Sequence, residues 1–128
     1  MSPSSQITIL IVEDEPDTAE MFAEMMRLSG YRVLKSFGGA AAMGTLQRES
    51  PDAVVLDLMM PDISGLEVLR FLRRDPRLEN IPVIVVSAKG LPSDIKDGLD
   101  AGASMYLTKP VSFLDLKKAV EKVIAEAD

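Results

Sequence analysis

The sequence predicts an α/β fold in which a five-stranded parallel sheet is doubly wound, as a (βα)5 unit with helices on both faces. Five short apolar runs rich in β-branched residues alternate with five segments whose apolar residues recur at helical spacing. Such regular alternation is typical of a parallel sheet buried on both faces. The chain has 128 residues, 47% of them apolar, which suffices for one core. We expect a single domain over residues 1–128, with its core at about 7–125 and a polar tail at 1–6.

The first half of the chain begins with a strand at residues 7–12, a run of β-branched and apolar side chains. An acidic segment containing Pro16 follows, and proline and acidic residues are both favoured in the first turn of a helix. Apolar residues at helical spacing extend this helix to about Gly30, a residue type that commonly follows a helix end. Residues 31–37 alternate apolar and polar side chains and predict the second strand.

The remaining elements follow from the same two patterns, apolar runs for strands and helical spacing for helices. Gly44 interrupts the second helix and lowers its helix propensity. Ser112 opens the last helix with Asp115 three positions on, an Asp variant of the capping box. After a turn at 38–39, the expected elements are helix 40–48, strand 53–58, helix 64–73, strand 81–87, helix 92–101, strand 103–107 and helix 112–125.

The composition excludes several classes of function. Lys and Arg total 14 and Asp and Glu total 20, so the formal net charge is −6, which argues against direct nucleic-acid binding. Cysteine and histidine are absent, which excludes disulfides, thiolate or histidine metal sites and histidine-based catalysis. The longest uncharged apolar stretch, residues 81–88, is too short to span a membrane. No secretion leader opens the chain, and we expect it in the cytoplasm.

Polar side chains follow four of the five predicted strands. Glu13 and Asp14 follow the first, Asp57 ends the third, Ser87 ends the fourth and Lys109 follows the fifth. In an open parallel sheet, ligands bind beyond the carboxyl ends of the strands. Each of these residues alone is also compatible with a solvated loop, but together they predict a site at one edge of the sheet.

Asp57 lies within an apolar run, where an unpaired charge is costly. If Glu13 and Asp14 lie nearby, three like charges repel each other, and a divalent cation relieves that repulsion. Mg²⁺ prefers oxygen ligands, of which Asp14 and Asp57 could supply two, with Glu13 acting through a water. A carboxylate is also a known covalent phosphate acceptor, and Lys109 is the available cation for a phosphoryl group.

The residues match a known family when they are taken in order. Glu13-Asp14, the segment 57–65, Ser87-Ala88, Tyr106 and Lys109-Pro110 together resemble the receiver domain of two-component response regulators. The resemblance extends from about residue 7 to residue 125, and the ordered set is far more specific than any one motif. It implies a flavodoxin-like sheet with strand order 2-1-3-4-5.

The resemblance also implies a phosphoryl acceptor and a metal site. Asp57 would accept phosphate from a phosphohistidine on a sensor histidine kinase or a histidine phosphotransfer protein. Asp14, Asp57 and the backbone carbonyl of Met59 would hold Mg²⁺, with Glu13 acting by way of water. The domain would then not be an enzyme for other substrates, since it would catalyse only its own phosphorylation and dephosphorylation.

A conformational switch is a further implication. Lys109 would pair with the phosphoryl group, and the Ala88 N–H would reach one of its oxygens. Ser87 would move toward the phosphoryl group and Tyr106 would turn inward, which alters the face formed by the fourth helix, the fifth strand and the fifth helix. That face would contact a downstream protein target. The bond before Pro110 is expected to be cis, which is inexpensive only before proline.

One departure from the family bears on assembly. Receivers attached to winged-helix DNA-binding domains often dimerise through an acidic pair before the Tyr position and a basic residue in the last helix. Ser104, Met105 and Ala119 occupy those positions here, so that dimer is not expected. This favours a single-domain regulator acting through protein contacts, without direct binding to nucleic acid or membrane. The alternative is that the chain is one domain of a longer protein.

Three alternatives stand beside this interpretation. A haloacid dehalogenase phosphatase needs an acid two residues after its nucleophile, where this chain has Met59. A flavin or nucleotide binder needs an anion cradle after the first strand, where the residues 13–15 are acidic. The remaining alternative is a phosphorylation-independent, receiver-like interaction module. Such modules typically lose an acidic residue or the lysine, and this chain has them all.

Overall fold

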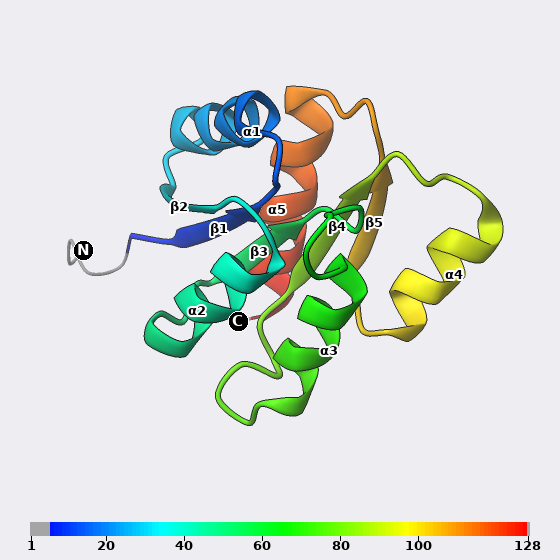
Figure 1. The fold of residues 1–128 in the computed structure, drawn as a ribbon. Helices are drawn as coiled ribbons and strands as arrows, with labels where there is room; N and C mark the ends of the chain where they lie inside the picture. The colour runs from blue at the N-terminus through cyan, green and yellow to red at the C-terminus, as the bar shows by residue number, and fades with distance from the viewer. Residues whose placement is uncertain (1–5, 128) are drawn as a thin grey trace.

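The computed structural model describes residues 6–127, so the predicted polar tail at 1–6 lies, apart from Gln6, outside the described residues. Strands and helices alternate along the whole described chain (Figure 1). The elements are β1 Thr8–Val12, α1 Pro16–Leu28, β2 Arg32–Ser36, α2 Gly39–Arg48, β3 Ala53–Leu56, α3 Gly65–Arg74, β4 Val83–Ser87, α4 Pro92–Asp100, β5 Met105–Thr108 and α5 Phe113–Ala127.

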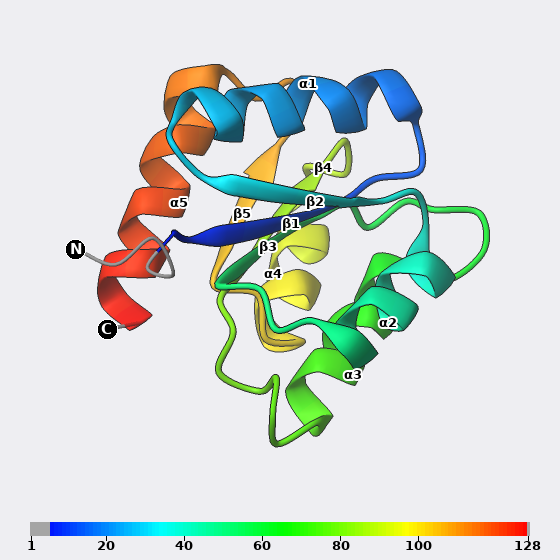
Figure 2. The ribbon, with the colours of Figure 1, turned by 90° about the vertical axis from the view of Figure 1, so that its left-hand side faces the viewer.

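The five strands form one sheet in the order β2-β1-β3-β4-β5, and every neighbouring pair is parallel. Helices α1 and α5 cover one face of this sheet, and α2, α3 and α4 cover the other (Figures 1 and 2). The predicted doubly wound fold and its strand order are therefore confirmed. None of the helices within residues 6–127 combines the length and apolar character that crossing a bilayer requires.

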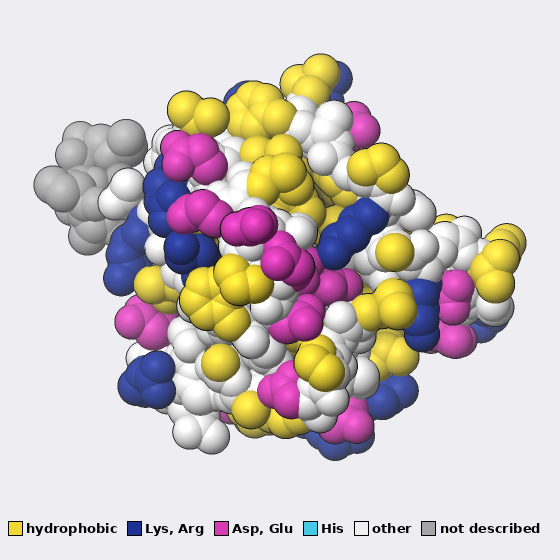
Figure 3. Space-filling model, turned by 45° about the horizontal axis from the view of Figure 1, so that its top comes forward, with side chains coloured by type: hydrophobic (Ala, Val, Ile, Leu, Met, Phe, Trp, Pro, Cys, Tyr) yellow, Lys and Arg dark blue, Asp and Glu magenta, His cyan; other side chains and the backbone are white. Residues whose placement is uncertain are grey.

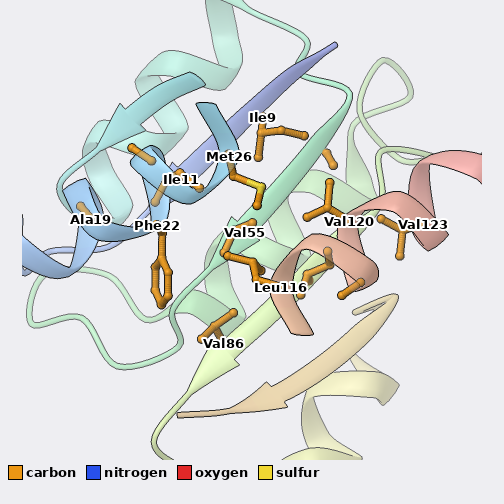
Figure 4. Packing of buried hydrophobic residues seen from close by; sticks show 14 residues of the cluster. Ile9, Ile11, Ala19, Phe22, Met26, Val55, Val86, Leu116, Val120 and Val123 are labelled. Atoms are coloured by element: carbon orange, nitrogen blue, oxygen red, sulfur yellow. The ribbon is translucent and has the colours of Figure 1, made fainter. Parts of the chain in front are cut away.

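Two hydrophobic clusters, one on each face of the sheet, explain why the central strands are uniformly apolar. Successive side chains of a strand point to opposite faces, so Ile9 and Ile11 enter one cluster and Leu10 and Val12 enter the other. Figure 4 shows the first cluster, where side chains of α1 and α5 pack on the sheet. With both faces covered, the central strands show no polar alternation.

Most differences from the predicted boundaries lie at strand ends. β3 ends at Leu56, two residues earlier than predicted, because the chain turns after Asp57 and the Leu58 carbonyl accepts the Gly65 N–H at 3.0 Å. β4 begins at Val83 and not at residue 81, since Pro82 has no N–H to donate to a neighbouring strand. The last helix begins one residue after Ser112, whose hydroxyl accepts the Asp115 N–H at 3.0 Å as a cap.

Arg73 of α3 binds backbone carbonyl groups at the end of the molecule where the strands begin. Its Nε and Nη2 donate to the Gly102 carbonyl at 3.0 and 2.8 Å, and its Nη1 donates to the Ile81 carbonyl at 2.7 Å. Gly102 has a φ of +114°, and a Cβ there would lie 2.8 Å from the Arg73 Cγ. The turn after α4 is thus fastened to α3 by a guanidinium group.

Candidate metal centre

An acidic cluster forms where β1 and β3 end side by side. These strands pair in parallel with Val12 opposite Leu56, so the residues that follow each strand meet at one edge of the sheet. Glu13, Asp14 and Asp57 bring carboxylate oxygens within 4.8 Å of one another. Glu13 is only 2% exposed and Asp57 only 6% exposed. Figure 3 shows acidic side chains gathered across this face of the molecule, with a basic side chain beside them.

Lys109 reaches this cluster from the turn between β5 and α5. Its Nζ lies 2.7 Å from Glu13 Oε1 and 3.5 Å from Asp57 Oδ2. Its backbone N–H donates to the Ser87 carbonyl at 2.8 Å, which aligns this turn with the end of β4. The Lys109–Pro110 peptide bond is cis, as the resemblance implies.

The ionisable groups of the cluster shift one another. Burial raises the pKa of Asp14 above its usual 3.8, and a hydrogen bond and charge repulsion from Glu13 act in the same direction. Burial alone would lower the pKa of Lys109. Its hydrogen bond to Glu13 and the charge of Asp57 outweigh burial, so its pKa lies above the usual 10.5. The cluster therefore combines a stably charged ammonium with more carboxylates than that ammonium can neutralise.

Asp57 is held by its own loop. Its Oδ1 accepts the Met59 backbone N–H at 3.1 Å, and its Oδ2 faces Lys109. The loop folds back tightly at Gly65, where a Cβ would lie 2.3 Å from the Asp57 carbonyl oxygen. Met59 itself is 52% exposed, so this segment lies at the surface of the acidic cluster.

The cluster suits a hard divalent cation. Its donor atoms are carboxylate oxygens, which Mg²⁺ prefers, and their mutual repulsion favours a bound cation. A soft or imidazole-seeking metal would find neither sulfur nor nitrogen ligands here, because the chain has no Cys or His. The side chains present thus fit the magnesium site expected from the sequence.

The two predicted switch residues meet at the backbone of Lys89. Ser87 is fully buried, and its Oγ accepts the Lys89 N–H at 3.2 Å. The half-buried Tyr106 donates its hydroxyl to the Lys89 carbonyl at 2.6 Å. The Tyr106 ring also lies against α4, where a Cβ on Gly98 would approach it to 2.8 Å. Ala88 lies exposed between these groups, directly after Ser87.

Asp62 is a side chain near the site that sequence patterns do not single out. Its carboxylate accepts the backbone N–H groups of Gly39 and Ala40 at 3.1 and 3.0 Å, at the start of α2. These partners lie more than twenty residues away in the chain, so no local capping motif reveals them. The only sequence signal is indirect: the Gly38-Gly39 pair opens a helix without a capping side chain of its own.

Comparison with known proteins agrees with this geometry. The family model for the response regulator receiver domain matches residues 9–121. The probable transcriptional regulatory protein TcrX of Mycobacterium tuberculosis is 42% identical over 106 residues, which cover 83% of this chain and 44% of that protein. The polar-differentiation response regulator DivK of Brucella ovis is 29% identical over 94% of this chain and 98% of its own length.

Solved structures show the same fold. A response regulator from Chloroflexus aurantiacus superposes with a TM-score of 0.90 at 31% identity, covering 94% of this chain and 99% of that one. The receiver domain of sensor histidine kinase PA1611 from Pseudomonas aeruginosa, at 30% identity and a TM-score of 0.87, covers 94% and 99%. That structure is described with a magnesium ion coordinated in its active site cleft.

The length of the relatives varies. The chain spans about half of several curated relatives, at 44% of TcrX and 51% of the phosphate regulon regulator PhoB of Pseudomonas aeruginosa. It spans nearly all of DivK. The share of the relative that lies outside the match therefore differs from one relative to the next.

Proposed function

The chain belongs to the response regulator receiver domain family, and we propose that it accepts a phosphoryl group on Asp57 from a phosphohistidine. The donor would be a sensor histidine kinase or a histidine phosphotransfer protein. The observation that carries the proposal is the setting of Asp57, whose Oδ1 is held by the Met59 N–H while its Oδ2 lies 3.5 Å from Lys109 Nζ. One carboxylate thus has a fixed orientation and a cation beside it.

The transfer forms one bond and breaks one. A carboxylate oxygen of Asp57 bonds to phosphorus, the bond from phosphorus to the donor imidazole nitrogen breaks, and the electron pair stays on that nitrogen. Charge on the transferred group is spread over its three non-bridging oxygens. Lys109, whose raised pKa keeps it charged, supplies a cation to one of them.

Asp14, Asp57 and the Met59 carbonyl are the proposed Mg²⁺ ligands, with Glu13 acting through water. When bound, Mg²⁺ supplies positive charge that offsets the negative charge on the oxygens of the transferred group. Glu13 has a second role in this arrangement: its Oε1 holds the Lys109 ammonium at 2.7 Å, and its Oε2 accepts the Glu15 N–H at 3.1 Å. The chain's own residues therefore orient both the acceptor and the cation.

The phosphoryl group would act as a switch through Ser87, Ala88 and Lys109. Shifting a conformational equilibrium from 1:99 to 99:1 needs about 5.5 kcal/mol of differential stabilisation. Hydrogen bonds to a charged group contribute about 1.5–3 kcal/mol each, so about two to four new contacts supply that difference. Movement of Ser87 would disturb its bond to the Lys89 N–H, and Tyr106 is bonded to the Lys89 carbonyl. The proposed output is the α4-β5-α5 face.

The wider setting belongs to the same proposal. We place the reaction in the cytoplasm, with a downstream protein as the target and without direct contact to nucleic acid or membrane. The described chain would act as one receiver domain that catalyses only its own phosphorylation and dephosphorylation. DivK, which matches over nearly its whole length, provides a precedent for a receiver that needs no large output domain in the same chain.

Intact-mass analysis after exposure to acetyl phosphate and Mg²⁺ tests the proposal. We expect one added phosphoryl group on the wild-type chain and none on Asp57→Asn, whose amide is a poor nucleophile. Asp52→Asn, which changes a carboxylate at the opposite end of β3, is the matched control and should label normally. Labelling of Asp57→Asn would place the acceptor elsewhere. A wild-type chain that takes no label would favour the phosphorylation-independent interaction module.

A further inference from the structure

The segment from the last residue of β2 to the first turn of α2 contacts both loops that carry the acidic cluster, although it contributes no side chain to that cluster. The Ser36 carbonyl accepts the Glu13 backbone N–H at 3.1 Å. A few residues later, the Gly39 and Ala40 N–H groups donate to the carboxylate of Asp62 at 3.1 and 3.0 Å. One segment therefore spans the loop after β1 and the loop after β3.

Asp62 supplies the cap that α2 lacks. The N-cap residue Gly38 has no side chain to accept a hydrogen bond, so the first N–H groups of α2 would otherwise be left to solvent. A carboxylate at a helix N-terminus also interacts favourably with the helix dipole. The hydrogen bonds from Ala40, Ile63 and Gly39 lower the pKa of Asp62, so this position favours the charged form of the carboxylate.

Two glycines allow the close approach that this cap requires. A Cβ on Gly39 would lie 2.6 Å from the Ile63 Cβ and 2.7 Å from the Ile63 carbonyl oxygen. Gly38 has a φ of +150°, and a Cβ there would lie 3.2 Å from both carboxylate oxygens of Asp62. The backbone at the start of α2 thus lies directly against Asp62 and Ile63 of the loop after β3, with little room for a side chain on either glycine.

The loop after β3 is fastened at three places. The Met59 N–H is bound to Asp57, the Leu58 carbonyl is bound to the Gly65 N–H, and Asp62 is bound to α2. Met59, whose carbonyl is the third proposed Mg²⁺ ligand, lies between the first and last of these attachments. We propose that Asp62 is a positioning residue for the Mg²⁺ site, which holds the Met59 segment in place by anchoring it to α2. This inference rests on the proposed function.

A magnesium titration followed by backbone amide resonances tests the inference without phosphorylation. The test variant is Asp62→Ala, and the matched control is Asp52→Ala. Asp52 is also exposed and also accepts a backbone N–H, that of Thr8 at 2.8 Å, but it lies at the amino end of β3. Both variants remove one negative charge. A parallel titration at about 1 M salt, where the Debye length is about 3 Å, separates loss of position from loss of long-range charge.

We expect Asp62→Ala to bind Mg²⁺ about three- to tenfold more weakly than the wild type, the range set by the loss of one helix cap. Asp52→Ala should change the affinity by less than about twofold. Asp62→Asn, which retains one accepting oxygen, should fall between the wild type and Asp62→Ala. Amide hydrogen exchange of residues 59–63 without metal should accelerate in Asp62→Ala alone, a change that a pure charge effect does not produce.

Gly39→Ala is a second route to the same displacement, because it keeps the carboxylate and drives a Cβ into Ile63. It should weaken Mg²⁺ binding in the same direction. Equal affinities for Asp62→Ala and Asp52→Ala at about 1 M salt would overturn the inference while the proposed function stands, provided that the wild type binds Mg²⁺ and takes the phosphoryl group. A wild type that does neither overturns both.

Discussion

At the scale of single residues, Lys109 dominates the electrostatics of the site. It pairs with Glu13 and Asp57, two nearly buried carboxylates, and its pKa lies above the usual 10.5 although burial acts in the other direction. Because the folded-state pKa of Lys109 lies above its unfolded-state pKa, the ion pairs of Lys109 give their full stabilisation of the folded state below about pH 10.5. This stabilisation is lost as the pH rises through the folded-state value.

Lys109→Ala should lower the free energy of unfolding of the metal-free protein by about 1–3 kcal/mol, because two nearly buried carboxylates lose their ammonium partner. Mg²⁺ binding should persist, since the cluster becomes more negative. Under the proposed function, phosphorylation should no longer alter the α4-β5-α5 face. Urea denaturation and amide resonances measure these effects. Lys117→Ala, which breaks an exposed pair with Glu121, is the control and should leave stability nearly unchanged. Equal destabilisation by both substitutions would contradict the assigned role.

In the folded protein the charged form of Asp14 is disfavoured, whereas the charged form of Lys109 is favoured. The folded-state pKa of Asp14 is raised by burial and then by Glu13, so the native state binds more protons than the unfolded state just above pH 3.8. Stability of the metal-free protein therefore falls as the pH rises through that interval. Asp14→Asn should remove this fall and weaken Mg²⁺ binding by more than about tenfold. Denaturation curves at several pH values, with and without Mg²⁺, measure both. An unchanged pH profile would contradict the prediction.

At the scale of elements, two helices carry an internal glycine for different reasons. In α2, a Cβ on Gly44 would meet nothing nearer than the Arg48 Nη1 at 3.8 Å. In α4, a Cβ on Gly98 would lie 2.8 and 2.9 Å from two carbons of the Tyr106 ring. Glycine in α2 thus only lowers helix propensity, whereas glycine in α4 makes room for the aromatic ring.

The same substitution should therefore have opposite effects in the two helices. Gly44→Ala should raise the free energy of unfolding by about 0.5–1 kcal/mol through helix propensity. Gly98→Ala should give no such gain and should displace the Tyr106 ring, visible as a shift of its aromatic resonances. Urea denaturation, with the m value held constant, compares the free energies of unfolding of the two variants. A gain of similar size in both helices would show that the ring does not depend on Gly98.

At the scale of the whole molecule, the surplus of negative charge at one end of the sheet links metal binding to folding. A ligand that binds only the native state stabilises it in proportion to the logarithm of its concentration over Kd. Mg²⁺ at about one hundred times its Kd should raise the free energy of unfolding by about 2.7 kcal/mol. Calorimetry at matched ionic strength measures this, and Asp14→Asn should lose most of the gain. An equal gain in the free energy of unfolding in sodium chloride would indicate that the salt screens the repulsion between the carboxylates and that no Mg²⁺ is specifically bound.

The fold and most of the site follow from the sequence because both depend on strand ends. Apolar runs mark strands that are buried on both faces, and parallel strands bring Glu13, Asp14 and Asp57 to a common edge. The link from Asp62 to α2 could not be predicted, since it joins backbone groups that only the folded sheet brings together. The exact ends of strands could not be predicted where the apolar pattern continues beyond the last residue that pairs with a neighbouring strand. Leu58 is an example, because it is apolar and buried but lies two residues after the end of β3.

The fastening of the turn after α4 by Arg73 has a mechanical consequence. The far end of that helix is clamped through Gly102, while its near end follows Lys89, the residue whose backbone joins Ser87 and Tyr106. In the proposed switch, a displacement that begins at Ser87 would therefore move the start of α4 more than its end, which the Arg73 guanidinium group holds in place. The travel would be greatest at Leu91, which is 66% exposed, and would fade toward Gly102.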